Sequence, residues 1–353
     1  MKLFKCPSCG QVLFFENTSC VSCGRRLGYD ADSDVMTSLD EGPEGVWTAP
    51  RPLSGTFRFC ENADHDVCNW LIPAESDERY CKACRHNRTV PDTSDPLSLQ
   101  HWRKIEGAKH RLIYTLLRLG LPLPGPGEAD EPLVFAFLAD TPDQDGPKVM
   151  TGHENGLSTI ALAEADDAER ETRRAAMGEP YRTLVGHFRH EVGHFYWDRL
   201  IRDAGKIAEC RAVFGDDSQD YEAALQRHYE NGPPANWGEH YVSAYATTHP
   251  CEDYAETWTQ YVTIIDTLEM ATACRLTVAH GEGPPDLAIE AEIDVYAEPD
   301  MGRIVGTWLP VAFAMNSINR CMGQGDFYPF VLAPPVIEKL AFMHDLVRSS
   351  RIH

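Results

Sequence analysis

The sequence predicts an α+β protein in which two small cysteine-rich modules precede one larger domain. Eight of the twelve cysteines fall before residue 85, and six of those eight sit in C-x-x-C pairs. From Pro91 onward the composition is that of an ordinary globular domain, with strand-like segments first and long helical patterns after them. We therefore expect a zinc ribbon at 1–30, a linker and a second four-cysteine zinc module at 31–95, and the large domain at 96–353.

The first module is defined by two C-x-x-C turns, each followed by glycine. The ligands they supply are Cys6, Cys9, Cys20 and Cys23. Glycine allows the tight turn that points backbone amides at the thiolates, and two such turns form a closed tetrahedral site for structural zinc. A module this small cannot fold on its own core, so the metal must supply the folding free energy, roughly 10–16 kcal/mol for such sites.

The second module follows a stretch rich in Pro, Gly and acids at 30–55, which we interpret as a linker. Its candidate ligands are Cys60, Cys68, Cys81 and Cys84. Only the last two have C-x-x-C spacing, and His65 is an alternative to one of the cysteines. A second structural zinc is favoured over four unrelated buried thiols.

Charge and the start of the chain narrow the class of protein. The formal net charge is -22, from 32 basic and 54 acidic residues, so nucleic acid and anionic membranes are unfavourable partners. The first residues contain no apolar signal-peptide core, and no stretch has the 18 or more apolar residues that a membrane span needs. We expect a cytoplasmic protein whose paired thiols bind metal rather than form disulfides.

Hydrophobic periodicity gives the elements of the large domain in order. A helix is expected at 99–120, ending at Gly120, and strands at 131–140 and 156–166. A long helical pattern then runs over 166–201, with a break expected near Gly178 to Pro180. Further helices are expected at 220–230, 238–246, 250–270 and 305–322.

The motif H-E-x-x-H occurs once in that long pattern, as His190, Glu191 and His194. Residues four apart lie on one helical face, so both imidazoles can bind a single ion. Glu191 lies beside them, where it can reach a metal-bound water. Zinc lowers the pKa of such a water toward ~7, and the carboxylate accepts its proton and passes it to the leaving amine. His187, one turn earlier, is an alternative ligand.

The third ligand is expected from the helix that begins at Pro250. Its opening turns carry Glu252, Asp253 and Glu256. We favour Glu252 as the metal ligand, with Glu256 one turn further on accepting the second N–H of a ligand histidine. The alternative is that these acids only complement the positive end of the helix dipole.

H-E-x-x-H followed by a helix with E-x-x-x-E resembles the gluzincin metallopeptidases. The whole chain is also similar to a bacterial family of zinc-binding metallopeptidases with an N-terminal zinc ribbon, through "CPSCG…CVSCG", "VCNWLIP", "TGHENGLSTIALAEAD", "EPYRTLVGHFRHEVGHFYW" and "NSINRCMGQGDFYPFVL". The resemblance implies a zincin-like metallopeptidase domain at 96–353. It also implies that His190, His194 and Glu252 are the ligands and that Glu191 is the general base.

Tyr245, seven residues before Glu252, is spaced as in the lethal-factor-like branch of the gluzincins. There a tyrosine so placed stabilises the tetrahedral intermediate. Tyr241 and Tyr254 are alternatives, and helix packing would also explain a tyrosine here. The segment 156–166 is a candidate for the edge strand with which zincins pair an extended substrate.

We therefore expect a zinc metallopeptidase with one catalytic and two structural zinc ions. It would act on a peptide or protein substrate and would have a possible protein partner at the ribbons. The alternative is a zinc-ribbon adaptor for protein or nucleic acid, with an idle zincin domain. Its support is the segment 79–120, which has nine Lys or Arg against three acids. The overall charge of -22 opposes nucleic-acid binding, and the presence of Glu191, which folding does not need, favours chemistry.

Overall fold

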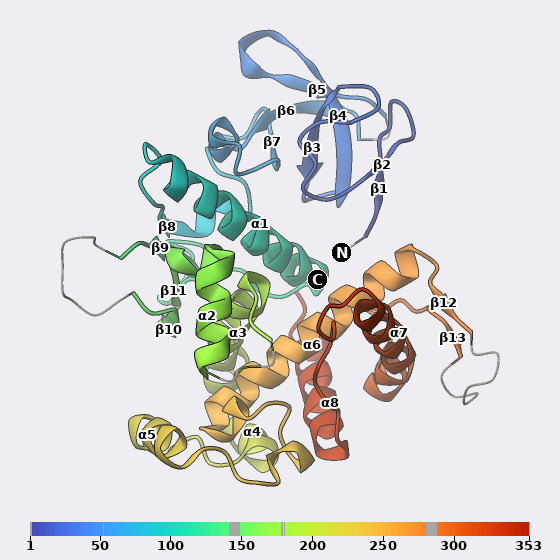
Figure 1. Cartoon of the computed structure of the whole chain (residues 1–353). Helices are drawn as coiled ribbons and strands as arrows, with labels where there is room; N and C mark the ends of the chain where they lie inside the picture. The colour runs from blue at the N-terminus through green and yellow to red at the C-terminus, as the bar shows by residue number, and fades with distance from the viewer. Residues whose placement is uncertain are drawn as a thin grey trace. The chain divides into compact units, whose positions relative to one another are not determined.

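Strands and helices concentrate in different parts of the chain, as the α+β prediction required (Figure 1). The computed structural model describes residues 2–51, 53–140, 149–177, 179, 181–279 and 288–352. These form two units. The first comprises residues 1–114 and 123–173, and the second comprises residues 115–122 and 174–353. Most strands belong to the first unit and most helices to the second.

The first unit begins with a short antiparallel hairpin of β1 (Phe4–Lys5) and β2 (Val12–Leu13). A five-stranded antiparallel sheet of order β3-β4-β5-β6-β7 follows (Figure 1). Its strands are β3 (Arg26–Asp30), β4 (Val35–Glu41), β5 (Trp47–Ala49), β6 (Gly55–Phe59) and β7 (Leu71–Pro73). Leu39, Ala49, Phe57 and Leu71 form a buried cluster on this sheet.

The interpretation of 30–55 as a linker is wrong, because this segment supplies β4 and β5 to the sheet. Met36 and Leu39 are each only 2% exposed, so they anchor β4 in the core. The acids, prolines and glycines that suggested a linker lie largely in the turns between the strands. Composition averaged over the segment therefore described its turns and obscured its short strands.

A second sheet in the first unit has the order β10-β11-β9-β8. Its strands are β8 (Asn87–Thr89), β9 (Val134–Leu138), β10 (Gly152–Glu154) and β11 (Leu157–Ala161), and helix α1 (Pro96–Arg118) lies between β8 and β9 in the chain. The candidate edge strand, β11, is not at an edge, because β10 pairs with it on one side and β9 on the other. Asn155 and Gly156, both at positive φ, make the tight turn that folds β10 back.

The second unit is mainly helical. Its helices are α3 (Leu184–Trp197), α4 (Ile207–Phe214), α5 (Tyr221–Asn231), α6 (Pro250–Ala273), α7 (Met301–Cys321) and α8 (Pro334–Ser349). A short hairpin of β12 (Thr277–Val278) and β13 (Ile289–Glu290) precedes α7. Helix α2 (Asp167–Met177) bridges the boundary between the units in the chain. The expected break falls between α2 and α3, although Gly178 and Pro180 lie outside the described residues.

The helix expected at 238–246 is absent. Two single 3-10 turns, Trp237–Glu239 and Tyr245–Thr247, lie there instead. The hydroxyl of Ser243 accepts a hydrogen bond from the backbone N–H of Ala246 over 3.1 Å. Such local side-chain bonds compete with helical hydrogen bonding. Among the helices that the structure describes, none has the length and hydropathy needed to cross a membrane.

Helix α6 is the centre of the second unit and contacts α3, α4, α7 and α8. Its apolar side chains, among them Trp258 and Tyr261, are fully buried. The crossing of α3 over α6 is close at Gly193, the residue before the second histidine of H-E-x-x-H. A Cβ on Gly193 would lie 3.0 Å from Ala255 Cα and 3.1 Å from Trp258 Cδ1. Glycine here allows the two helices that carry the candidate metal ligands to meet.

We expect Gly193→Ala to lower the free energy of unfolding by about 1–3 kcal/mol, because the added methyl group must displace backbone of α6. Gly306→Ala is the matched control, since Gly306 is an exposed residue of α7 with no described atom within 4 Å of an added Cβ. Its helix propensity should make that variant up to about 1 kcal/mol more stable. Chemical denaturation measures both, and an unchanged stability for Gly193→Ala would contradict the close crossing.

Candidate active site and zinc sites

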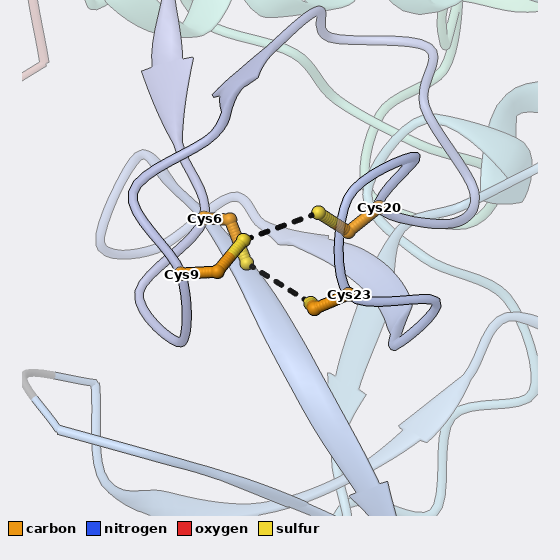
Figure 2. Close-up of side chains that lie close together, drawn as sticks. All are labelled: Cys6, Cys9, Cys20 and Cys23. Carbon is orange, nitrogen blue, oxygen red and sulfur yellow. Dashed lines mark hydrogen bonds between the residues drawn. The ribbon is translucent and has the colours of Figure 1, made fainter.

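The four cysteines of the first module converge on one point (Figure 2). Cys9 and Cys20 place their sulfurs 3.6 Å apart, and Cys6 and Cys23 place theirs 3.8 Å apart. Bonds of about 2.3 Å from zinc to sulfur imply about 3.8 Å between sulfurs in a tetrahedral site. Gly10 and Gly24 take positive φ after the two turns, as the glycine spacing predicted. These residues fit a structural zinc ion.

The second set of cysteines also converges, although only one pair has C-x-x-C spacing. The ligand atoms of Cys60, Cys68, Cys81 and Cys84 all lie within 4.8 Å of one another, and all four residues are buried. Backbone N–H groups of Trp70 and Cys84 donate to the sulfurs of Cys68 and Cys81 over 3.4 Å each. Burial raises the pKa of both thiols, so the thiolates that such hydrogen bonds favour also need a bound cation. His65 is not in this group, and its ring lies 5.7 Å from that of Trp102.

A buried polar network on α1 lies against this second site and was not foreseen from the sequence. His110 Nε2 is 3.5 Å from the sulfur of Cys84. Glu106 and Lys109 are fully buried and form an ion pair at 2.7 Å. Trp102 Nε1 donates to the other oxygen of Glu106 over 3.0 Å. Because the ammonium of Lys109 already neutralises Glu106, we do not assign this carboxylate as a metal ligand, although it lies close to Cys84 and His110.

We expect Lys109→Met to destabilise the protein by about 3–5 kcal/mol, because it leaves the Glu106 carboxylate buried without its counter-charge. Lys104 offers a control on the same helix, since its ion pair with Asp167 is 38% and 71% exposed. Lys104→Met should change stability by less than about 1 kcal/mol. Thermal or chemical unfolding measures the stability of both variants. Equal losses of stability would show that the buried ion pair contributes no more than the exposed one.

The H-E-x-x-H histidines meet Glu252 across the α3–α6 crossing. His190 Nε2 lies 3.2 Å from His194 Nε2 and 3.0 Å from Glu252 Oε2, and His194 Nε2 lies 3.6 Å from Glu252 Oε1. Zinc bonds of about 2.0–2.1 Å imply roughly 3.3 Å between neighbouring ligand atoms of a tetrahedral site. The two imidazole nitrogens and the Glu252 carboxylate therefore fit a zinc ion, with one position left for water or substrate.

The orientation of His190 is set by Glu256 on the next turn of α6. Glu256 Oε1 lies 2.9 Å from His190 Nδ1, so Nδ1 carries the proton and Nε2 presents a lone pair. The other oxygen of Glu256 accepts from the hydroxyl of Ser243 over 2.7 Å. That lone pair of His190 faces Glu252 Oε2, an acceptor with no hydrogen-bond donor in the described part of the chain. Two acceptors at 3.0 Å repel unless a proton or a metal cation lies between them. Burial opposes protonation of His190, but Glu252 and Glu256 raise the pKa of its imidazole well above the ordinary value, and a bound zinc ion would take the place of the proton on Nε2.

Glu191 is beside this cluster and is only 7% exposed. Burial raises the pKa of its carboxyl to about 7. Burial also disfavours the charged form of Glu252, but the imidazoles of His194 and His190 lower the pKa of that carboxyl to about 2. Glu252 is therefore an anion near pH 7, whereas Glu191 is partly protonated there and can both accept and donate a proton.

The other acid of the α6 first turn, Asp253, is engaged elsewhere. Its Oδ2 accepts from Lys339 Nζ over 2.6 Å in a buried ion pair. Neither Asp253 nor His187 belongs to the group of donor atoms that includes His190. Of the alternative ligand sets that the sequence left open, the structure brings together His190, His194 and Glu252.

Of the three candidate tyrosines, Tyr245 lies nearest the cluster, with its ring 6.0 Å from that of His190. Tyr241 lies under the ammonium of Lys339, 4.3 Å from ring centroid to Nζ. Tyr254 is fully buried against Phe214. A fourth tyrosine, Tyr221 of α5, was missed. It donates to Glu252 Oε1 over 2.7 Å, and only a contact between distant segments could reveal it.

Comparison with known proteins identifies the family. A model of the family described as "putative zinc-binding metallo-peptidase" matches residues 98–346, and a zinc-ribbon domain model matches residues 3–95. The chain belongs to this zinc-binding metallopeptidase family. Its N-terminal part is a zinc-ribbon domain that includes both sets of cysteines.

Relatives of this metallopeptidase family member occur in mycobacteria. The protein Rv2568c of Mycobacterium tuberculosis and the protein Mb2598c of Mycobacterium bovis, both described as uncharacterized, are each 38% identical to the chain. Each match covers 98% of this chain and 95% of the relative. No solved structure matches the chain.

The basic segment of this family member is largely neutralised by acids. Eight of its nine cations form ion pairs, namely Arg79–Glu61, Lys82–Asp32, Arg85–Glu128, Arg103–Asp66, Lys104–Asp167, Lys109–Glu106, Arg111–Glu16 and Arg118–Glu269. A nucleic-acid interface needs cations free to replace counterions on phosphates. The excess of cations in the sequence is therefore not an excess of unpaired charge.

Proposed function

We propose that the chain is a zinc-dependent peptidase that hydrolyses peptide or amide bonds at the cluster of His190, His194 and Glu252. The observation that carries the proposal is the meeting of two imidazole nitrogens and the Glu252 carboxylate, with 3.0–3.6 Å between their nearest atoms. The buried carboxyl of Glu191 lies beside them, on the helix that carries the two histidines. A zinc ion held there would supply Lewis-acid chemistry, polarising the substrate carbonyl and making water acidic.

In this proposal Glu191 moves the proton. With a pKa raised to about 7 by burial, its carboxylate accepts a proton from the attacking water and, once protonated, donates it to the leaving amine. Glu256 keeps His190 in the tautomer that presents Nε2. Ser243 in turn holds Glu256. The two glutamates of α6 thus have different roles, Glu252 as ligand and Glu256 as the group that orients a ligand.

Tyr245 is proposed to donate its hydroxyl to the carbonyl oxygen of the substrate as that oxygen gains negative charge. Its ring stands 6.0 Å from His190, and burial raises the pKa of its hydroxyl, so the group is a donor at all relevant pH values. Preorganised donors of this kind contribute to catalysis because they act where charge develops.

The two sets of cysteines are proposed to hold one structural zinc each, so that the protein as a whole holds three zinc ions. Their closed sulfur sites fit this role because a fourth sulfur occupies the position that a catalytic zinc leaves open. The zinc-ribbon domain is also proposed to bind a protein partner. A purely adaptor role with an idle second unit is the competing function, and it predicts no turnover.

Cleavage of a proteome-derived peptide library tests the proposal. The protein is incubated with the library, and new peptide termini are identified by mass spectrometry. We expect new termini with the zinc-loaded protein and a yield about 10²–10⁴-fold lower with Glu191→Gln at the same concentration. Absence of cleavage by the zinc-loaded protein, together with capture of a partner at the zinc-ribbon domain, would favour the adaptor.

A further inference from the structure

Tyr221, the first residue of α5, contacts the candidate metal ligand on α6. Its hydroxyl donates to Glu252 Oε1 over 2.7 Å. The other oxygen, Oε2, is the one that faces His190 Nε2 at 3.0 Å. Glu252 is only 2% exposed, so few other groups can satisfy Oε1. Oε1 also lies 3.6 Å from His194 Nε2, but only Oε2 has no hydrogen-bond donor in the described part of the chain. The tyrosine therefore occupies Oε1 and leaves Oε2 for the metal.

The position of Tyr221 is fixed by contacts between the starts of α5 and α6. The ring of Tyr221 meets that of His249 edge to face, with centroids 5.4 Å apart. His249 Nδ1 accepts from the backbone N–H of Cys251, which places its proton on Nε2, and Nε2 donates to the carbonyl of Gln219 over 3.1 Å. One imidazole thus caps α6 and holds the chain just before α5.

Tyr221 keeps its proton for this contact. Burial, and after it the charge of Glu252, raises the pKa of the Tyr221 hydroxyl and of the Tyr245 hydroxyl, so both groups are proton donors. The single proton of Tyr221 goes to Glu252, which leaves the hydroxyl of Tyr245 to serve a separate role.

We infer that Tyr221 is a positioning residue, which fixes Glu252 as a metal ligand through one oxygen. The inference rests on the metal site of the proposed function and not on peptide hydrolysis. Packing alone does not explain the contact, because Tyr221 is 40% exposed and buries less surface than a core tyrosine.

The test is Tyr221→Phe in the full chain, which removes the hydroxyl and keeps the ring against His249. Tyr229→Phe is the matched control, because Tyr229 lies on the same helix and is 67% exposed. Tyr245→Phe is the third variant. After mild chelation, each protein is titrated with zinc, and the open site is separately loaded with Co²⁺ to record its visible spectrum.

We expect Tyr221→Phe to weaken zinc binding at this site about 10- to 100-fold and to change the Co²⁺ spectrum. It should also lower kcat more than it changes KM. Tyr229→Phe should match the wild type in every measurement, and Tyr245→Phe should keep the wild-type zinc affinity.

Wild-type zinc affinity and an unchanged Co²⁺ spectrum in Tyr221→Phe would overturn the inference. An equal loss of zinc in Tyr229→Phe would also overturn it, because the effect would then belong to α5 and not to the hydroxyl. If the wild type cleaves no peptide, the proposed function fails, yet the comparison of affinities and spectra still decides the role of Tyr221 toward Glu252.

Discussion

Glu191→Gln is expected to slow peptide hydrolysis by about 10²–10⁴-fold while leaving the zinc content unchanged. Glutamine has the shape of glutamate but cannot accept a proton from water. Glu191 does not belong to the group of residues whose ligand atoms meet at the cluster, so the substitution should leave the zinc affinity unchanged. The variant therefore separates proton transfer from metal binding.

Initial rates on a peptide identified from the library, together with elemental analysis, measure this effect. Glu209→Gln is a suitable control, because Glu209 is exposed on α4 and should give wild-type rates. Full activity in Glu191→Gln would show that another group is the base. Loss of zinc from Glu191→Gln would instead place this side chain in the metal site.

The second large effect is expected from the carboxylates of α6. Glu252→Ala should lose the zinc of the His/Glu cluster, because it removes one of three ligands and two histidines on one helix hold zinc poorly. Glu256→Ala should weaken that zinc only about 10- to 100-fold, because it releases the second N–H of His190 and deletes no ligand. Isothermal titration with zinc after mild chelation ranks the two variants.

Asp253→Ala provides the contrast within the same helical turn. Its expected defect is in stability, about 3–5 kcal/mol, because Lys339 would remain buried without its partner. Zinc affinity measured below the unfolding transition should be unchanged. If Asp253→Ala loses zinc while Glu252→Ala keeps it, the assignment of the third ligand is wrong.

The parts of the site that the sequence predicts are those with fixed spacing along one element. His190 and His194 share a face of α3, and Glu252 and Glu256 share a face of α6, because residues four apart are neighbours on any helix. The C-x-x-C turns are local for the same reason. In each case the chemistry depends on a short stretch of chain whose conformation the sequence specifies.

The parts that could not be predicted depend on contacts between distant segments. Tyr221 reaches Glu252 across 31 positions of the chain, and Ser243 reaches Glu256 only because 238–246 does not form the helix that its pattern suggested. The pair of Glu106 and Lys109 looks like any exposed pair on a helix until its burial against the second zinc module is known.

The strands of the first unit show the same limit. Short strands such as β5, with three residues, carry too little periodicity to be recognised between acidic turns. Sheet order is also not local, because the hairpin at Asn155 and Gly156 places β10 outside β11 and removes that strand from the edge. Whether a short segment forms a strand, and whether that strand lies at an edge, both depend on the strands that pair with it.

The most direct test of the central claim is the rate of peptide hydrolysis measured as zinc is returned to the protein. Mild chelation should remove the zinc of the open His/Glu site first and leave the closed four-sulfur sites loaded. We expect this protein to be inactive and to regain full activity at one added equivalent of zinc per chain. Hydrolysis that persists after this zinc is removed, or that never appears at any zinc content, would contradict the account.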